Sequence, residues 1–481
     1  MPGDKTLWSW GYNAYGQLGD ETELRDSSPV QVGALTDWLS VDSGNSHILA
    51  TKIDGTLWSW GRNNNGQLGL GDEGAGTDRS SPEQVGSLND WHSVSGGSIF
   101  TAAVKINGTI WTWGDNIDGQ LGIEDRDDRS SPEQVGTLAD WRSIICGSSH
   151  AVATKTDGTL WTWGGNVNGE LGLEDIIDRS SPVQVGSLTN WSSIACGAVY
   201  TIALKTDGTL WAWGSNTEGQ LGLEDVDDRS SPEQVGSLTT WRFVADTYYQ
   251  TLAIKSDETL WAWGSNTNGR LGLEDVDHRS SPEQVGTLSD WNFVVGGWGH
   301  TVALKTDGTL WTWGLDDEGQ LGRDTLNTHL SSPEQVGSET DWSSVTGGSY
   351  HTLAIRGPIV IEDVVVRLLT GPGTWCWGHD TDVAEEYIGD LAEGSGTGTV
   401  ENSGDAEKLT LLGGQSWTLP AKESGVVNVL ISYDVYQSGS GGPGTIEYRT
   451  GEDQSACEAA GWNTYTAKFP SSGWVQIRVS N

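Results

Sequence analysis

Four histidines, His47, His150, His300 and His351, recur at one position of an internal repeat. Imidazole suits acid–base catalysis near neutral pH and is a common metal ligand. A metal site or a catalytic triad, however, needs several residue types that converge within a few ångströms. If the repeats close into a ring, equivalent positions are spread around its axis. We therefore interpret the histidines as structural side chains that close the start of a strand, and we assign no catalytic or metal-binding residue.

Acidic clusters precede the sequence Arg-Ser-Ser-Pro in four of the repeats. They are Glu124-Asp125-Arg126-Asp127-Asp128, Glu174-Asp175, Glu224-Asp225-Val226-Asp227-Asp228 and Glu274-Asp275-Val276-Asp277. Carboxylates could bind Ca²⁺, but these loops lack the Gly and the terminal Glu of a calcium-binding hand. The simpler interpretation is local pairing with the adjacent arginines, Arg129, Arg179, Arg229 and Arg279. No cofactor is predicted, and calcium at the acidic loops stays as the weaker alternative.

Binding residues are predicted where the copies of the repeat differ. One turn carries a variable triplet, which reads Asn45-Ser46-His47, Ser98-Ile99-Phe100, Ser148-Ser149-His150, Ala198-Val199-Tyr200, Tyr248-Tyr249-Gln250, Trp298-Gly299-His300 and Ser349-Tyr350-His351. If this turn opens on one face of the fold, its aromatic residues form an arc typical of binding hot spots. The candidate binding residues are Tyr200, Tyr248, Tyr249, Trp298, His300, Tyr350 and His351. The alternative is drift at tolerant loop positions.

Strands must position these candidates. The sequence Trp-x-Trp-Gly occurs seven times, with its first tryptophan at Trp8, Trp58, Trp111, Trp161, Trp211, Trp261 and Trp311. The spacing is 50 residues apart from one step of 53. A period of this length, rich in strand signals, predicts a β-propeller with one blade per repeat.

One repeat, from Arg179 to Leu223, is predicted to hold four short strands, at 180–186, 191–197, 200–205 and 209–214. Asp207-Gly208 between the last two indicates a tight hairpin, because glycine adopts a positive φ at little cost. The tryptophans of the Trp-x-Trp strand share one face, with a small residue between them. Together with a third repeated tryptophan, they are interpreted as packing between blades rather than as sugar-binding sites.

The two ends of the array predict that the ring closes. The first Trp-x-Trp strand, from Lys5, has no preceding partner, and the strand at 351–356 has no Trp-x-Trp strand after it. Pairing the two within one blade removes the aggregation-prone edges of an open array. The predicted fold of residues 1–356 is therefore an all-β, seven-bladed propeller closed by its N- and C-terminal strands.

The repeat resembles that of the regulator of chromosome condensation family. The resemblance rests on Leu-Trp-x-Trp-Gly-x-Asn-x-x-Gly-Gln-Leu-Gly, complete at 57–69 and 210–222, followed by Ser-Ser-Pro-x-Gln-Val and Gly-x-x-His-Thr-x-Ala, and it covers residues 5–355. It implies a seven-bladed propeller. The family includes a guanine-nucleotide exchange factor, ubiquitin-ligase modules, a photoreceptor and secreted β-lactamase inhibitors. These activities share no single site, so the fold leaves the function open.

Guanine-nucleotide exchange is not expected of this chain. The resemblance implies that exchange depends on an additional hairpin projecting from one blade. The largest insertion here is three residues, in the loop 71–78. This loop is too short to supply such a hairpin.

Charge narrows the possible partners. Lys and Arg total 26 against 66 Asp and Glu, which gives a net charge of −40. So acidic a chain is not expected to bind nucleic acid or an anionic membrane. No stretch approaches the ~18 apolar residues of a membrane span, and the sequence from Met1 to Lys5 lacks the features of a secretory signal. The predicted location is a virion or an extracellular surface, with the cytoplasm as the alternative.

Beyond Arg356 the repeat ends, and residues 357–481 are predicted to form a β-sandwich. Its predicted strands are 359–369, 408–412, 426–436, 445–450 and 474–480. His379 is the only histidine of this region, so no Ser-His-Asp constellation is predicted. Its tryptophans could line a carbohydrate site or fill a core, namely Trp375, Trp377, Trp417, Trp462 and Trp474. Cys376 and Cys457 could pair in an oxidising compartment, whereas Cys146 and Cys196 are interpreted as small buried residues.

Two functions from different classes are predicted. In the first, the chain is a non-enzymatic display or adhesion protein. Its propeller presents a rigid face, and the sandwich attaches it to a larger assembly such as a phage virion. In the second, the chain is a protein-interaction module that binds or inhibits a specific enzyme. The predicted partner is a protein or a surface glycan, and no enzymatic activity is predicted.

Overall fold

The computed structural model describes residues 5–245 and 247–357, together with seven strand segments between residues 398 and 479. The chain divides into two compact units, Gly3–Pro358 and Ile359–Asn481. The first unit is built of strands, and its one helical element in the described residues is the short 3₁₀ turn η1 (Thr267–Gly269). Within the described part of the chain, no helix has the length and apolar character to cross a membrane.

Seven four-stranded antiparallel sheets form the blades of the first unit. The first strands of neighbouring blades contact one another around the whole ring, so they lie innermost. They are β3 (Trp38–Ser43), β7 (Trp91–Gly96), β11 (Trp141–Cys146), β15 (Trp191–Cys196), β19 (Trp241–Ala245), β23 (Trp291–Gly296) and β27 (Trp342–Gly347). The second strands are β4 (His47–Lys52), β8 (Phe100–Lys105), β12 (His150–Lys155), β16 (Tyr200–Lys205), β20 (Gln250–Lys255), β24 (His300–Lys305) and β28 (His351–Arg356). The predicted propeller is thereby confirmed.

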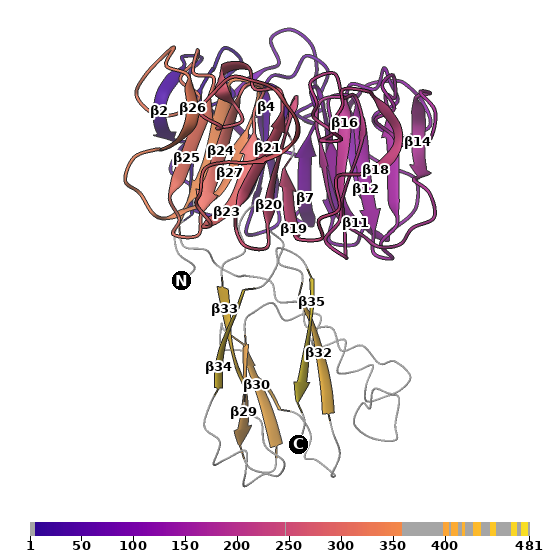
Figure 1. Cartoon of the computed structure of the whole chain (residues 1–481), viewed down its shortest axis with the longest axis vertical. Coiled ribbons are helices and arrows are strands. Elements are labelled where there is room, and N and C mark those ends of the chain that lie inside the picture. Colours follow the sequence, from indigo (N-terminus) through magenta and orange to yellow (C-terminus); the bar gives the residue numbers. More distant parts are fainter. Residues whose placement is uncertain are drawn as a thin grey trace. The chain divides into compact units, whose positions relative to one another are not determined.

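The third strands carry the Trp-x-Trp-Gly sequence, and the fourth strands, which carry Ser-Ser-Pro, lie at the rim (Figure 1). The third strands are β1 (Thr6–Gly11), β5 (Leu57–Gly61), β9 (Ile110–Gly114), β13 (Leu160–Gly164), β17 (Leu210–Gly214), β21 (Leu260–Gly264) and β25 (Leu310–Gly314). The fourth strands are β2 (Asp26–Gln31), β6 (Arg79–Gln84), β10 (Arg129–Gln134), β14 (Arg179–Gln184), β18 (Arg229–Gln234), β22 (Arg279–Gln284) and β26 (Leu330–Gln335). Proline has no amide hydrogen to donate to a neighbouring strand. It is tolerated in this outermost strand because an edge strand has a neighbour on one side only.

The ring closes as predicted. One blade has the order β2-β1-β28-β27, so two strands come from each end of the array. Strands β1 and β28 pair over their full length, from Thr6 opposite Arg356 to Gly11 opposite His351. Neither strand of this pair is left as an open edge.

The hairpins between second and third strands follow from local chemistry. Asp207 Oδ1 accepts hydrogen bonds from the amide and the hydroxyl of Thr209, at 3.0 and 2.7 Å. Gly208 has φ +78°, and an added Cβ would lie 2.2 Å from the Thr239 carbonyl oxygen. Only the sixth copy departs from this pattern, where Glu258 adopts φ +64°. Glycine at this turn is therefore favoured both by conformation and by space, although the sixth copy forms the same turn with Glu258.

Tryptophans fill the spaces between blades. The second tryptophan of each Trp-x-Trp pair is fully buried, and Trp213 Nε1 donates to the main-chain carbonyl of Glu170 in the preceding blade, at 2.9 Å. The inner-strand Trp191 packs edge-on against Trp211 and Trp213, with centroids 6.3 and 6.1 Å apart. The first tryptophan of each pair is half-buried. The prediction that these tryptophans pack between the blades is confirmed for the propeller.

A cation, buried in six of the seven blades, covers the tryptophans at the hairpin end of each blade. In the blade of β3–β6, the Lys52 ammonium lies 4.2 Å from the Trp58 ring centroid and 3.3 Å from an Asp37 carboxylate oxygen. The equivalent cations are Lys105, Lys155, Lys205, Lys255, Lys305 and Arg356. Asn190 takes the place of the aspartate beside Lys205, and burial lowers the pKa of this ammonium group. We call the end of the propeller that carries these seven cations and the six hairpins the hairpin face.

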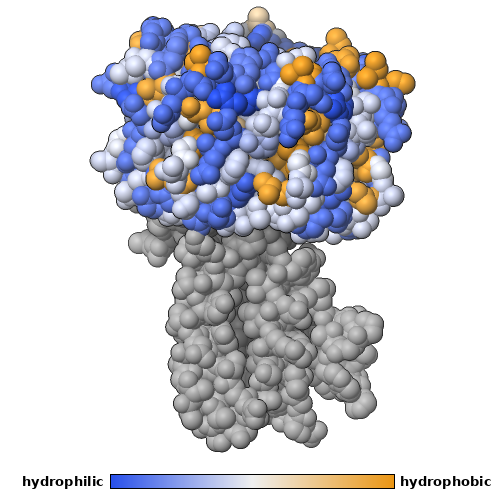
Figure 2. Space-filling view, viewed as in Figure 1, coloured by the Kyte–Doolittle hydropathy of each residue, from blue (hydrophilic) through white to orange (hydrophobic). Residues whose placement is uncertain are grey.

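The rim of the propeller is mainly hydrophilic, with hydrophobic side chains in separate places (Figure 2). The most exposed aliphatic residues include Ile106, Ile117 and Val167, at 71%, 66% and 71%. They stand on different loops. Cys146 and Cys196, in contrast, are 5% and 3% exposed, as predicted.

The second unit contributes paired strands. One sheet has the order β29-β30-β31, and β32 pairs with β35 and β33 with β34. Their bounds are β29 (Gly398–Ser403), β30 (Ala406–Leu411), β31 (Ser416–Thr418), β32 (Val427–Tyr433), β33 (Pro443–Tyr448), β34 (Asn463–Lys468) and β35 (Gly473–Val479). The predicted strand 359–369, the Cys376–Cys457 pair and most of the predicted β-sandwich lie outside the described residues.

Candidate functional site

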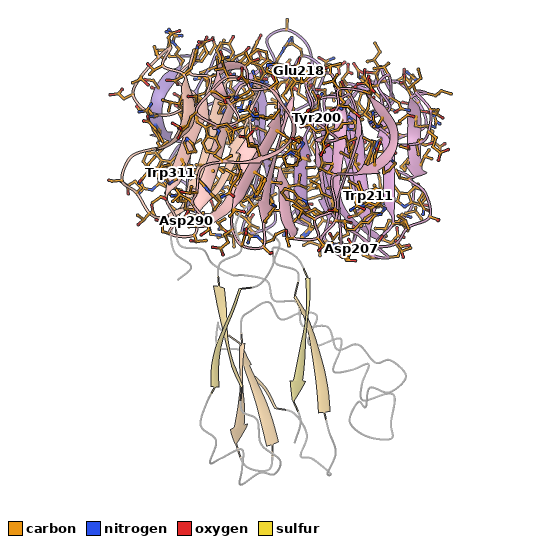
Figure 3. The ribbon with its side chains drawn as sticks, viewed as in Figure 1. Tyr200, Asp207, Trp211, Glu218, Asp290 and Trp311 are labelled. Carbon is orange, nitrogen blue, oxygen red and sulfur yellow. The ribbon has the colours of Figure 1, made fainter. Side chains whose placement is uncertain are left out.

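The variable triplets all lie at one end of the propeller. Each triplet joins a first strand to a second strand, whereas each Asp-Gly turn joins a second strand to a third, so the two sets of turns lie at opposite ends of antiparallel strands. Beside each triplet runs the loop that follows Trp-x-Trp-Gly, and Tyr12 N donates to Tyr350 O at 2.8 Å. Figure 3 shows Glu218, from one such loop, toward the upper end of the propeller, and Asp207 at the lower end of the propeller. We call the upper end, made by the triplets and these loops, the triplet face.

The third residue of every triplet is buried. His47, Phe100, His150, Tyr200, Gln250, His300 and His351 are each at most 1% exposed. The prediction that Tyr200, His300 and His351 belong to a binding surface is therefore corrected. They begin the second strands, and their side chains turn into the interface between blades instead of toward solvent.

These buried side chains join neighbouring blades. His47 Nε2 lies 3.1 Å from Thr101 Oγ1, which donates to the Gln67 carbonyl at 2.8 Å. Because that hydroxyl has given its one proton to the carbonyl, His47 Nε2 must be the donor. The equivalent pairs are His150–Thr201, Gln250–Thr301 and His300–Thr352, at 3.2, 2.9 and 2.9 Å. The structural interpretation of the histidines is thereby confirmed.

Burial also sets the protonation state of the histidines. It lowers the pKa of His47 and His150 to about 4, and the pKa of His300 and His351 to about 3. All four are therefore neutral at neutral pH. No group of three or more His, Cys, Asp or Glu side chains among the described residues is arranged to hold a metal ion.

Four predicted aromatic residues do lie on the triplet face. Tyr248, Tyr249, Trp298 and Tyr350 are half-buried, so part of each ring remains open to solvent. The rings of Tyr248 and Tyr249 lie 5.3 Å apart, and those of Trp298 and Tyr350 lie 5.2 Å apart. The predicted aromatic arc is thus present as two contacting pairs.

The neighbouring loops extend this arc with residues that the sequence reading missed. Tyr12 packs against Tyr350 at 6.4 Å and against Tyr15 at 6.2 Å. The Arg62 guanidinium lies 4.9 Å from the Tyr15 centroid, and that of Arg270 lies 5.7 Å from the Trp298 centroid. We call Arg62, Tyr15, Tyr12, Tyr350, Trp298 and Arg270, in this order, the aromatic row. Bulky residues at otherwise small or polar loop positions are the signal that could have revealed them.

Arg270 replaces the glutamine that five copies carry before Leu-Gly. Its side chain is 3% exposed. Nε donates to the Thr267 carbonyl at 2.9 Å, and Nη1 donates to the Trp298 carbonyl at 2.8 Å. Burial lowers the pKa of Arg270 to about 10, and the nearby Glu218 partly offsets the shift. The guanidinium is therefore charged at neutral pH and held in one orientation.

Glu170 occupies the same position in another blade, where it places a buried carboxyl group instead of a guanidinium. Its side chain is 1% exposed, and Oε2 accepts a hydrogen bond from Asn168 N at 2.7 Å, as a glutamine oxygen does in the sister copies. Burial raises the pKa of Glu170 to about 7, and the charges of Asp178 and Asp118 add to the shift. This blade therefore carries a carboxyl group that titrates near neutral pH.

The acidic loops pair with their own arginines. Arg129 Nη2 lies 2.7 Å from Asp125 Oδ2, and Asp125 also accepts a hydrogen bond from Asn116. The same ion pair recurs as Arg179–Asp175, Arg229–Asp225 and Arg279–Asp275. The predicted local pairing is present.

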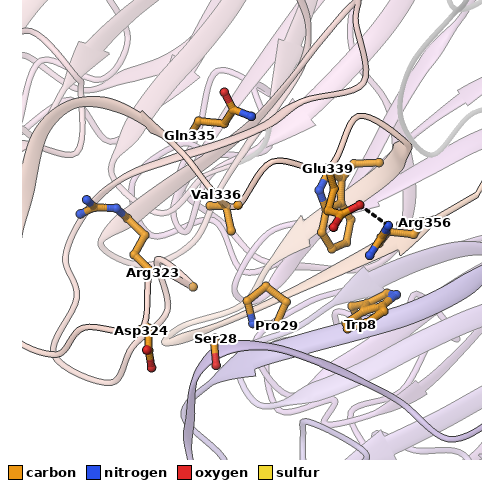
Figure 4. Close-up of a pocket in the computed structure, with 12 residues that line it drawn as sticks. Trp8, Ser28, Pro29, Arg323, Asp324, Gln335, Val336, Glu339 and Arg356 are labelled. Carbon is orange, nitrogen blue, oxygen red and sulfur yellow. Dashed lines mark hydrogen bonds and ion pairs between the residues drawn. The ribbon is translucent and has the colours of Figure 1, made fainter.

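A cavity of about 580 Å³ lies at the rim beside the closing blade (Figure 4). Two arginines line it. Arg356 pairs with Glu339 at 2.5 Å and with Asp341 at 2.9 Å, and Arg323 pairs with Glu334. Because these carboxylates already balance the charge, the cavity makes no demand for a charged ligand. The triplet face is the stronger candidate.

Comparison with protein families agrees with the geometry. A model described as the RCC1-like domain matches residues 139–382, and the regulator of chromosome condensation (RCC1) repeat matches residues 4–51, 54–104 and 107–154. The chain belongs to the regulator of chromosome condensation repeat family. The resemblance read from the sequence is thereby confirmed.

Solved structures of this family share the fold. Yeast RCC1 (Prp20), solved bound to Kap60, superimposes with a TM-score of 0.67 at 18% identity, over 74% of this chain and 90% of that chain. Human WBSCR16 gives a TM-score of 0.66 at 20% identity, over 74% of this chain and all of that chain. At such identities the likeness establishes the propeller and no more.

Curated relatives match over short segments. The probable E3 ubiquitin-protein ligase HERC6 of Homo sapiens is 31% identical over 124 residues, which is 25% of this chain and 12% of the relative. The E3 ubiquitin-protein ligase HERC2 of Homo sapiens is 30% identical over 123 residues, which is 2% of its length. The chain thus spans a small part of these relatives.

Proposed function

We propose that this member of the regulator of chromosome condensation repeat family is a protein-interaction module, and that it binds a protein partner through the triplet face. The observation that carries the proposal is the aromatic row, in which four half-buried rings and two arginines form consecutive contacts across blades. Tyrosine, tryptophan and arginine are the residues most enriched at binding hot spots.

The row is suited to binding because it is held in place before a partner arrives. The Tyr12 and Tyr350 backbones are hydrogen-bonded to each other, and Arg270 is fixed by two carbonyls. Side chains that are already ordered lose little conformational entropy on association. Aromatic rings add contact area with few rotatable bonds.

The comparisons favour this function over the alternatives. Prp20p from Saccharomyces cerevisiae, which shares the propeller fold, is described as binding Gsp1p and histones, and that binding belongs to Prp20p. The display or adhesion function, including a place in a phage virion, finds no support in the relatives found. We extend protein binding to this chain, without exchange or ligase activity.

The test compares two double variants of the full chain. Trp298→Ala/Tyr350→Ala removes two rings of the row, and Ser148→Ala/Ser149→Ala changes the corresponding triplet positions of another blade. Proteins cross-linked to each variant in lysate are identified, and each purified candidate is titrated against all three chains. We expect a partner that binds the wild type and the serine variant equally and the ring variant at least about tenfold more weakly. Recovery of the same partners with equal affinity by the ring variant would contradict the proposal.

A further inference from the structure

The aromatic row has a cation near each end. Its five consecutive steps, from Arg62 through the four rings to Arg270, are each between 4.9 and 6.4 Å. Arg270 also acts on Tyr249, because its charge offsets part of the burial-induced rise in the pKa of that tyrosine. An extended peptide advances about 3.3 Å per residue, so about eight residues cover the row at most.

Among the arginines that the structure describes, most pair with a carboxylate, whereas Arg62 and Arg270, like Arg142 and Arg242, do not. The ion-paired arginines are Arg25, Arg79, Arg126, Arg129, Arg179, Arg229, Arg279, Arg323 and Arg356. Within residues 5–245 and 247–357, neither Arg62 nor Arg270 lies within ion-pair distance of an aspartate or glutamate. The chain has 66 acidic and 26 basic residues, so its composition alone would lead us to expect a carboxylate beside each arginine.

The carboxylates around the row are already occupied. Glu318 pairs with Arg25 at 2.9 Å, and Glu218 lies 2.6 Å from His278. Asp317 lies 3.5 Å from His329. Each of these carboxylates therefore has its close partner elsewhere, and Glu218 acts on Arg270 only beyond ion-pair distance.

Of the two arginines, Arg270 has the greater need for a counter-ion. Its side chain is almost fully buried, yet its hydrogen bonds go to two neutral carbonyls. A buried cation without a counter-ion costs folding free energy, and a carboxylate brought by a ligand would offset that cost. Arg62 is only half-buried, but its Nε is buried and has no hydrogen-bond partner among the described residues.

We propose that the aromatic row recognises an acidic segment of the partner protein, with carboxylates on Arg62 and Arg270 and apolar side chains on the rings between them. This inference rests on the proposed function and adds the chemical class of the partner. A basic segment fits less well, because its cations would meet two arginines that already cover the outer rings. The net negative charge of the chain repels an acidic partner at long range, but salt screens that repulsion beyond about 8 Å.

The experiment selects peptides from a displayed random library on the full chain and titrates the enriched sequences as synthetic peptides. Arg270→Gln and Arg62→Ser introduce the residues that sister copies carry at these positions, so both variants are expected to fold. Arg142→Ser is the matched control, because it removes one positive charge at the hairpin-face end of β11, away from the triplet face. Thermal unfolding of each variant is measured alongside, and Arg270→Gln should be at least as stable as the wild type.

We expect enriched peptides with Asp or Glu on both sides of apolar residues. Their affinity should fall about 10- to 100-fold in Arg270→Gln, less in Arg62→Ser, and remain unchanged in Arg142→Ser. Enrichment of basic or uncharged peptides that respond to Trp298→Ala/Tyr350→Ala but not to the arginine variants would overturn this inference and leave the proposed function standing. Peptide binding that responds to neither set would overturn both.

Discussion

The two faces of the propeller are built from the same repeat, yet one is nearly uniform and the other varies from blade to blade. On the hairpin face, each turn is tied to the next blade, as where Trp241 N donates to Gly208 O at 3.3 Å. Beside each turn lies a cation that contacts the tryptophans, as Lys205 contacts Trp211. On the triplet face, neighbouring turns meet through main-chain atoms, as where Ala198 N donates to Tyr248 O at 3.0 Å.

This difference explains where the repeat is free to change. A main-chain hydrogen bond needs no particular side chain, so the first two triplet positions accept Ser, Ala, Tyr or Trp without loss of the ring. The third position and the hairpin residues fill space between blades, and a change there costs packing energy. Binding specificity can therefore differ between blades while the scaffold stays constant.

The largest expected effect comes from deleting a tryptophan behind the hairpin face. Trp141 is 3% exposed and packs against Trp161 and Trp163. Trp141→Ala should lower the free energy of unfolding by about 3–5 kcal/mol. Trp298→Ala, on the triplet face, should change it by less than about 1 kcal/mol, because its ring is half-exposed. Urea unfolding measures both, and equal losses would break the distinction between the faces.

The next effect concerns the buried carboxyl group beneath the triplet face. The pKa of Glu170 rises from 4.5 to about 7 on folding, so the proton it holds stabilises the native state fully below pH 4.5. That stability is lost as the pH rises through about 7. Glu170→Gln should therefore gain up to about 3 kcal/mol over the wild type between pH 4.5 and pH 8. Unfolding curves across this range measure it, and a difference that does not change with pH would exclude a titrating Glu170.

A histidine of the same interior should act in the opposite pH direction. The pKa of His150 falls from 6.5 to about 4 on folding, so stability is complete above pH 6.5 and declines as the pH falls toward 4. Gln250 shows that glutamine can make the equivalent hydrogen bond to Thr301, at 2.9 Å. Relative to its effect at pH 8, His150→Gln should recover about 2 kcal/mol at pH 5. The matched measurement on Gln250→His should show the reverse.

The smallest expected effect comes from restoring an ion pair beside one lysine of the hairpin face. Lys205 has Asn190 where Lys52 has Asp37, and its pKa is lowered by burial. Asn190→Asp should raise that pKa and add no more than about 1 kcal/mol to stability, because the carboxylate is partly exposed. Thermal unfolding at low and high salt measures the gain. A gain that is independent of salt would show that the ion pair is not its cause.

The fold could be predicted from features of the sequence that are local or repeated. Asp207-Gly208 predicts a turn from two residues, and the missing strand before Lys5 predicts closure from the count of strands alone. The site was only partly reached. Tyr248, Tyr249, Trp298 and Tyr350 were correctly placed on a face, but Tyr200 was assigned to the same surface although it points inward. Variability marks a turn that tolerates change, but it does not say which way each side chain points.

By itself the sequence determined the number of blades, the strands within each blade, the closure of the ring and the tryptophan packing, because periodicity and alternation are carried by every copy. Only the tertiary structure decided that Tyr12 and Tyr15 extend the arc from Tyr350, and that no carboxylate of the described residues pairs with Arg62 or Arg270. These outcomes depend on distances between side chains of different blades. Such distances arise when loops far apart in the chain meet on one face, and no single repeat contains them.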